Sequence, residues 1–161
     1  MASGVERFLE AASVLGHEVE VRRFPEGTRT ADDAARAIGC EVGQIVKSLV
    51  FMADDRPVLA LTSGANRVDT GRLAALVGAR QVRRADAEEA RAASGFAVGG
   101  TPPFGHPQPL PTLLDPDLAA YGEVWAAAGT PDAVFRTTTD ELARVTGATV
   151  APFREEPGAP R

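Results

Sequence analysis

The chain has 161 residues, 44% of them hydrophobic, and a formal net charge of −5 at pH 7. This length suits one globular domain, and the hydrophobic content excludes a disordered chain. The acidic balance argues against extensive tracking of a nucleic-acid backbone but leaves room for a local basic pocket. No apolar run approaches the roughly 20 residues that cross a bilayer, no signal-peptide pattern is visible, and the single cysteine cannot form an internal disulfide. We therefore expect a cytoplasmic protein without membrane association.

The first half of the chain predicts short helices followed by a hairpin. Its capping residues, alternating stretches and glycine stops give these elements: a helix from Ser3 to Gly16, a strand over His17–Phe24, a helix over Ala31–Ile38 between Thr30 and Gly39, and strands over Gln44–Phe51 and Val58–Thr62. The last two strands flank a short polar segment. This arrangement favours a β-hairpin.

The second half alternates further short helices and strands. By the same signals its elements are a helix from Asp69 to Gly78, a strand at Gln81–Val82, a helix from Asp86 to Ser94, strands over Leu110–Leu114, Glu123–Ala127 and Ala133–Thr137, and a helix over Asp140–Thr146 closed by Gly147. We predict one compact α+β domain over residues 1–151, with a mixed, largely antiparallel, barrel-like sheet surrounded by short helices. The tail from Pro152 to Arg161 is predicted to fray.

Lys47 is the only lysine among 17 lysine and arginine residues, and it interrupts the apolar strand QIVKSLVF. A strand lysine either reaches the surface along its alkyl stem or faces a polar cleft. Because this chain otherwise uses arginine, a lone lysine indicates a site that needs a compact point charge. Holding a phosphate or polarising a carbonyl oxygen would be such a role.

The loop Gly99–Gly105 is the second candidate. Paired glycines let backbone amides approach a ligand, and the prolines make the loop rigid, although an ordinary structural turn is the alternative interpretation. Asn66 and Arg67 follow a strand, and His106 follows the glycine loop; each is a weaker candidate because turn chemistry or an exposed loop position also explains it.

Other chemistries lack support in the sequence. The two histidines have no metal-ligand spacing with Cys40, so we expect no metal and no cofactor. Cys40 lies next to Glu41, whereas a thiolate nucleophile favours a positive neighbour. A small buried side chain is the favoured interpretation of Cys40.

Five segments in order resemble the YbaK/EbsC family, relatives of the editing domain of bacterial prolyl-tRNA synthetases. The similar segments are Thr30–Gly39, Gln44–Phe51, Ser63–Asp69, Ser94–Gly105 and Thr138–Ala148. The resemblance implies a trans-acting deacylase that hydrolyses the ester of a mischarged aminoacyl-tRNA, held mainly by its CCA end. The implied partners are that tRNA and a synthetase such as prolyl-tRNA synthetase.

The resemblance also implies a set of site residues. The signature lysine of the family falls on Lys47, and its glycine loop supplies Gly99, Gly100 and Thr101 as donors to an oxyanion. Implied substrate contacts are Phe24, Asn66, Arg67, Pro103, Phe104, His106, Ala127 and Gly129.

The chain departs from cysteine-specific members of the family. A Ser-Gly-Gly segment of those members corresponds here to Ala127-Ala128-Gly129, and a later aspartate corresponds to Val134. Small apolar walls would admit alanine, serine, threonine or cysteine, since a hydrophobic pocket rejects an added hydroxyl weakly. Two functions stay open at this point: the deacylase, and a non-catalytic module that binds aminoacyl-adenosine or a synthetase.

Overall fold

The helices begin and end at the residues that cap them. The computed structural model describes residues 3–28 and 30–156, and its helices are α1 (Gly4–Val14), α2 (Ala31–Ile38), α3 (Thr70–Val77), α4 (Ala87–Ser94) and α5 (Thr139–Thr146), with 3₁₀ turns η1 (Val42–Gln44) and η2 (Pro116–Ala120). The predicted α2 is confirmed in its bounds: the Thr30 hydroxyl accepts from the Asp33 amide, and Gly39 ends the helix in the left-handed conformation.

The described residues form one eight-stranded mixed sheet. Its strands are β1 (Val21–Arg23), β2 (Ile45–Ala53), β3 (Arg56–Ser63), β4 (Val82–Arg84), β5 (Thr112–Leu114), β6 (Val124–Ala127), β7 (Ala133–Thr137) and β8 (Thr149–Val150). The order is β1-β7-β6-β2-β3-β5-β8, and β4 also pairs with β2. The predicted α+β domain with a mixed sheet and surrounding helices is confirmed, with parallel pairs at β2–β6, β3–β5 and β5–β8 among the antiparallel ones.

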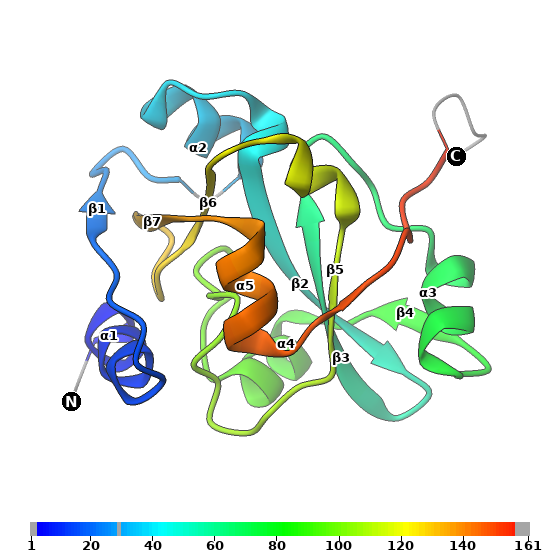
Figure 1. Cartoon of the computed structure of the whole chain (residues 1–161). Coiled ribbons are helices and arrows are strands. Elements are labelled where there is room, and N and C mark those ends of the chain that lie inside the picture. The colour runs from blue at the N-terminus through cyan, green and yellow to red at the C-terminus, as the bar shows by residue number, and fades with distance from the viewer. Residues whose placement is uncertain (1–2, 29, 157–161) are drawn as a thin grey trace.

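The strand β2 is the centre of this arrangement (Figure 1). It pairs with β3 from Val46 to Ala53 through the predicted hairpin. Its other edge meets two different partners, β6 at Ile45 and Val46, and β4 from Phe51 to Ala53. The sheet is therefore interrupted beside the middle of β2.

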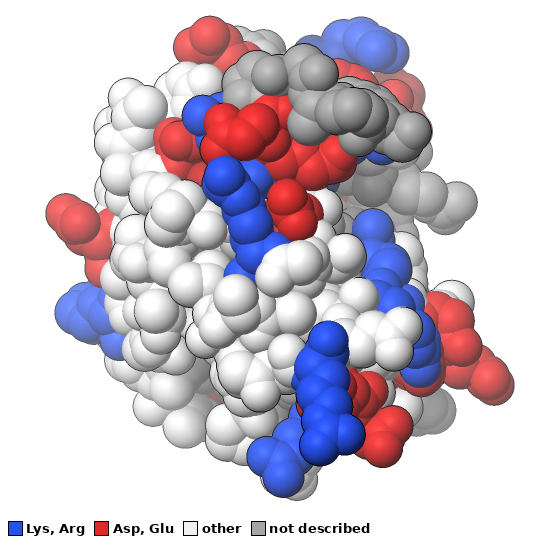
Figure 2. All heavy atoms as spheres, turned by 90° about the vertical axis from the view of Figure 1, so that its right-hand side faces the viewer, with Lys and Arg blue, Asp and Glu red and all other residues white. Residues whose placement is uncertain are grey.

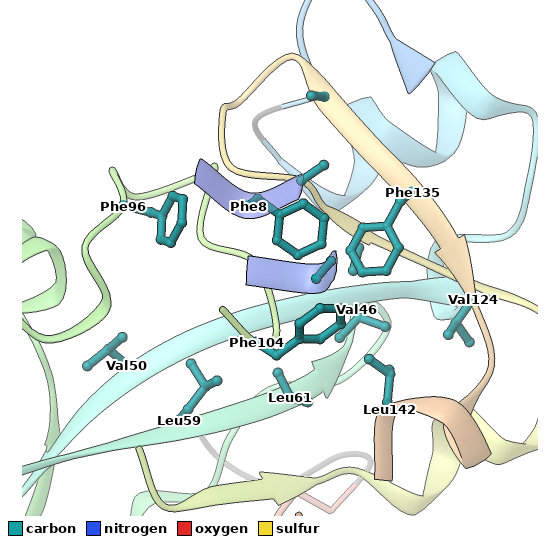
Figure 3. Packing of buried hydrophobic residues seen from close by; sticks show 14 of the residues in the cluster. Phe8, Val46, Val50, Leu59, Leu61, Phe96, Phe104, Val124, Phe135 and Leu142 are labelled. Carbon is teal, nitrogen blue, oxygen red and sulfur yellow. The ribbon is translucent and has the colours of Figure 1, made fainter. Parts of the chain in front are cut away.

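The main core lies between this sheet and helix α1. Phe8, Phe104 and Phe135 form an aromatic cluster with ring centroids 4.9–5.8 Å apart, and aliphatic side chains of β2, β3 and α5 surround it (Figure 3). Aromatic pairs at such separations contribute beyond the area that they bury. The cluster fixes Phe104, a residue of the glycine loop, against α1 and β7.

Two predictions at the ends of the chain were wrong. The strand predicted over His17–Phe24 is limited to Val21–Arg23, while His17 is buried with its ring edge-on to Phe104. The tail does not fray at Pro152. Phe153 is buried, its carbonyl accepts from the Asp69 amide, and Arg154 forms an isolated antiparallel β-bridge with Val68. Residues 157–161 lie outside the described part of the chain.

The surface charges are mixed. On the face shown in Figure 2, basic and acidic side chains lie next to one another, and neither sign covers the surface. In the described residues no helix is long and apolar enough to cross a membrane.

Candidate active site

A pocket of about 690 Å³ opens at the interruption in the sheet. Its lining comes from β2, β6, β7, the end of β4, helices α2 and α4, and the loop that carries Val98, Gly99 and Thr101. This size is typical of sites that take a small-molecule ligand. The hydrophobic cluster of Ala34, Ile45, Trp125 and Val134 packs α2 against the sheet and forms one end of the pocket.

Lys47 is held in this pocket by the loop after β3. Its Nζ donates a hydrogen bond of 2.6 Å to the backbone carbonyl of Asn66. An ammonium group has three donors, so two stay available to a ligand. Among the described residues that line the pocket, the charged side chains are Lys47 and Arg84, and none is acidic. The pocket of this acidic protein is therefore locally positive.

The pKa of Lys47 is lowered from its ordinary value. Burial of the ammonium is the main cause, followed by the positive charges of Arg84 and Arg67, and the carboxylates of Asp115 and Asp32 oppose the shift. Because Lys47 and Arg84 both line the pocket, the site would favour an anion that these two cations can share.

Two carboxylates bind the side chain of Asn66 and thereby hold its backbone carbonyl in place. The Asn66 amide nitrogen Nδ2 donates to Asp115 at 2.8 Å and to Asp117 at 2.9 Å. Asp115 is buried and also accepts from the backbone amides of Ser63 and Asp117. Asn66 was predicted to contact substrate, but its side chain faces this network, and its backbone is what reaches Lys47.

Arg84 is the free member of an arginine pair. Arg83 forms two 2.7 Å hydrogen bonds with the Glu89 carboxylate at the start of α4. Arg84 lies over the Phe51 ring at 5.9 Å and has no carboxylate within ion-pair distance among the described residues. Burial lowers the pKa of Arg84. The sequence prediction missed Arg84, because both arginines lie in the same short strand and only the ion pair of Arg83 with Glu89 distinguishes them.

The glycine loop forms a tight turn at the pocket. The Gly100 amide donates to the Ala97 carbonyl at 3.0 Å, and Gly99 has a φ of 89°, which describes a type II turn with glycine at its third position. The amides of Gly99 and Thr101 have no protein acceptor among the described residues, and both residues line the pocket. Gly100 is absent from the lining: a Cβ there would lie 2.7 Å from backbone atoms of Thr130.

The remaining predicted residues divide between the pocket and the core. Ala127 lines the pocket, as does its neighbour Ala126. Phe24, Arg67, Pro103, Phe104, His106 and Gly129 do not: Phe24 packs under α2, Arg67 is exposed, Pro103 and Phe104 are buried, and Gly129 donates to the Gly100 carbonyl at 3.0 Å.

His106 supports the loop instead of the pocket. Its Nε2 donates to the Pro102 carbonyl at 2.8 Å. Burial lowers the pKa of His106, and the hydrogen bond to Pro102 partly opposes this shift. This hydrogen bond holds the glycine loop at Pro102.

Metal and thiol chemistry find no site in the described residues. No cluster of three or more histidine, cysteine or carboxylate groups there could hold a metal ion. Cys40 is half-buried outside the pocket lining, and burial together with Glu41 raises the pKa of its thiol, against a smaller opposing backbone hydrogen bond. A raised pKa keeps a thiol protonated and unreactive.

Comparison with known proteins identifies a family for this geometry. A solved structure described as a candidate trans-editing enzyme for prolyl tRNA synthetase is 49% identical, with a TM-score of 0.90 over 97% of this chain and 99% of that one. EbsC of Enterococcus faecalis, named as a candidate Cys-tRNA(Pro)/Cys-tRNA(Cys) deacylase, is 28% identical over 87% of this chain and 90% of its own length.

Longer relatives contain the same domain. Proline--tRNA ligase of Limosilactobacillus fermentum is 30% identical over 73% of this chain, which spans only 21% of that enzyme. The family model described as the aminoacyl-tRNA editing domain matches residues 25–145, a range that includes Lys47, Arg84 and the glycine loop. The chain belongs to the aminoacyl-tRNA editing domain family.

Proposed function

We propose that this protein is a trans-acting deacylase that hydrolyses the ester bond of mischarged aminoacyl-tRNA. The observation that carries the proposal is the Lys47 ammonium, anchored by the Asn66 carbonyl in a pocket whose described lining has no acidic side chain. The 3′ end of a charged tRNA offers a phosphate and an ester carbonyl, both of which accept from such a group. The protein acts where aminoacyl-tRNA is made, which is the cytoplasm.

The walls of the pocket suit a small amino acid. Ala34, Ala126, Ala127 and Val134 present short apolar side chains to it. We expect alanine, serine, threonine or cysteine as cargo, since such walls discriminate by size and only weakly against an added hydroxyl. The tRNA for proline, mischarged with one of these amino acids, is the first to test, because relatives of this chain are domains of proline--tRNA ligases.

The main contribution of the protein to hydrolysis is electrostatic stabilisation of the transition state. Water adds its oxygen to the ester carbonyl carbon, and the carbonyl electron pair moves onto the oxygen. Lys47 and the amides of Gly99 and Thr101 are the donors that we assign to this oxyanion. One well-placed donor stabilises such a transition state by about 3 kcal/mol. Collapse expels the ribose oxygen, which takes up a proton, and frees the amino acid. The proton lost by water passes to solvent or to a substrate group.

Only the end of the tRNA needs to reach this pocket. The cations near it are Lys47, Arg84 and Arg67. We therefore expect a shallow dependence of binding on salt, because few phosphates are neutralised. A synthetase that hands over its mischarged tRNA is the other partner that we propose.

The test is release of the amino acid from purified charged tRNAs. A panel of tRNAs carrying alanine, serine, threonine, cysteine and proline is incubated with the protein, and the ester remaining is followed against time. Lys47→Met should lower kcat/KM by about a hundredfold or more while leaving the fold intact, since it removes a charged donor. Arg56→Met, a loss of charge at the exposed hairpin, is the matched control.

Two outcomes would contradict the proposal. If no charged tRNA is deacylated faster than it hydrolyses spontaneously, the protein is not a deacylase for this panel. If an aminoacyl-sulfamoyl adenosine binds while no tRNA is deacylated, the pocket is that of a non-catalytic binding module.

A further inference from the structure

The pocket lies against the backbone edge of β2 rather than against one face of the sheet. Six consecutive residues, 45 to 50, line it. Successive side chains of a strand point to opposite faces, so a pocket on one face would meet every second residue. A ligand here therefore has access to the main chain of β2.

Hydrogen bonds on either side show which backbone groups face the opening. The Ile45 carbonyl accepts from the Gly64 amide at 2.7 Å, so it points toward β3. The Val50 carbonyl accepts from the Ala85 amide at 3.1 Å, so it points to the opposite edge. Because direction alternates along a strand, the amide and carbonyl of Ser48 face the same edge as those of Val50.

Among the described residues, no strand occupies that edge at Ser48. The pairing with β6 ends at Val46, and the pairing with β4 begins at Phe51. The Ser48 amide and carbonyl thus have no ladder partner. The Ser48 hydroxyl is also buried without a hydrogen-bond partner in the described part of the chain. The amide, carbonyl and hydroxyl of Ser48 therefore lack hydrogen-bond partners at the pocket among the described residues. Native proteins satisfy nearly all buried polar groups, so we expect a ligand to bind them.

We propose that Ser48 binds the aminoacyl group through its backbone, as a single residue added to the edge of β2. This inference rests on the proposed function for its ligand. An aminoacyl ester carries one α-ammonium and one carbonyl, the groups that one residue exchanges with the residue opposite it in an antiparallel pair. The ammonium donates to the Ser48 carbonyl, and the ester carbonyl oxygen accepts from the Ser48 amide.

This pairing also orients the rest of the substrate. Directly opposed residues carry their side chains on the same face, so the cargo side chain lies beside the Ser48 hydroxyl. Lys47 projects from the other face of β2, where its Nζ reaches the Asn66 carbonyl. The ester is then held at the edge between the two faces. Recognition of the backbone groups serves any amino acid that carries a primary amine and fits the walls.

The experiment measures binding of a stable analogue. Labelled protein is titrated by NMR with 3′-alanylamino-3′-deoxyadenosine and with its 3′-propionylamino counterpart, which lacks only the amine. The first should bind about tenfold tighter or more, because a hydrogen bond to a charged group is lost in the second. The Ser48 amide signal should shift downfield with the first ligand.

Substitution of the strand tests the backbone directly. Ser48→Pro deletes an amide that no ladder bond uses, and it should weaken the alanyl analogue about tenfold. Ser48→Ala keeps the backbone and loses only the hydroxyl, so its loss should be about threefold or less. The matched control is Arg23→Pro. The Phe24 amide donates to the Asp132 carbonyl toward β7, so the Arg23 amide faces away from β7, and Arg23 is not among the residues that line the pocket.

The results separate this inference from the deacylase. Equal affinity for the two analogues, or unchanged affinity in folded Ser48→Pro, overturns it; if Ser48→Pro does not fold, the analogue pair on the natural protein decides. Preference for the alanyl analogue without hydrolysis of any charged tRNA supports Ser48 and refutes the deacylase. Hydrolysis of alanyl-tRNA with equal analogue affinities refutes Ser48 alone.

Discussion

Replacing Asn66 by alanine should slow the reaction by releasing Lys47. The Asn66 side chain makes two hydrogen bonds to carboxylates, at 2.8 Å to buried Asp115 and at 2.9 Å to the half-exposed Asp117. A hydrogen bond to a charged group contributes about 1.5–3 kcal/mol when buried and less when solvated, so we expect the free energy of unfolding to fall by about 2–3 kcal/mol. The carbonyl that anchors Lys47 would then move with its loop.

The effect on turnover should exceed the effect on binding. Misplacing a catalytic group by about 1 Å costs up to about a hundredfold in rate, so we expect kcat for Asn66→Ala to fall tenfold to a hundredfold with little change in KM. Stability is measured by urea unfolding followed through the fluorescence of Trp125, the only tryptophan. Turnover is measured on the best charged tRNA of the panel.

The control for Asn66 is a similar loss of hydrogen bonds far from the pocket. The Asp54 carboxylate accepts from the amides of Arg80 and Gln81 at the hairpin end, and Asp54 has a φ of 54°, so Asp54→Gly removes the carboxylate without straining the backbone. Asp54→Gly should be less stable and keep its kcat. If both variants lose kcat in proportion to their stability, or if Asn66→Ala keeps full kcat, the anchoring role of Asn66 is refuted.

Two further predictions concern Arg84 and the glycine loop. Arg84→Met should raise the pKa of Lys47, because burial of Lys47 stays while one of the positive charges that lower its pKa is gone. The rate of deacylation, corrected for spontaneous hydrolysis, should then fall at a higher alkaline pH than in the natural protein. Arg83→Met should leave the pH of this fall unchanged. A fall at the same pH in Arg84→Met would contradict the coupling. Gly100→Ala should cost about 1–3 kcal/mol of unfolding free energy, because its Cβ meets the Thr130 backbone, while Gly122→Ala, with open space around it, should be neutral in the same urea experiment.

Features that depend on neighbouring residues could be predicted from the sequence, and those that depend on distant pairing could not. Helix α2 was predicted to the residue because Thr30 and Gly39 mark its ends locally. The hairpin of β2 and β3 was predicted because its turn lies between two apolar stretches. The parallel pairing of β2 with β6 joins residues about 80 positions apart, and β8 has only two exposed residues, so neither leaves a local pattern.

The same limit applies to the site. Lys47 stood out by its residue type, and the turn at Gly99 by its glycines, and both lie at the pocket. Gly100 has the same composition signal, yet its close approach to Thr130 comes from a segment that only the fold brings near. Ser48 gave no signal at all, because a serine in a strand is unremarkable until the strand beside it is missing.

The interruption beside β2 links the fold to the chemistry. Two strands pair with one edge of β2 at its two ends, and the space between them is the pocket. A pocket built this way offers main-chain groups that side-chain substitution cannot alter, and these match the amine and carbonyl common to every aminoacyl ester. The alanine and valine walls around it can vary without disturbing that pairing. Recognition of the substrate class and choice of the amino acid would therefore rest on different atoms, so cargo preference could change by substitution in the walls while Lys47 and the edge of β2 keep their roles.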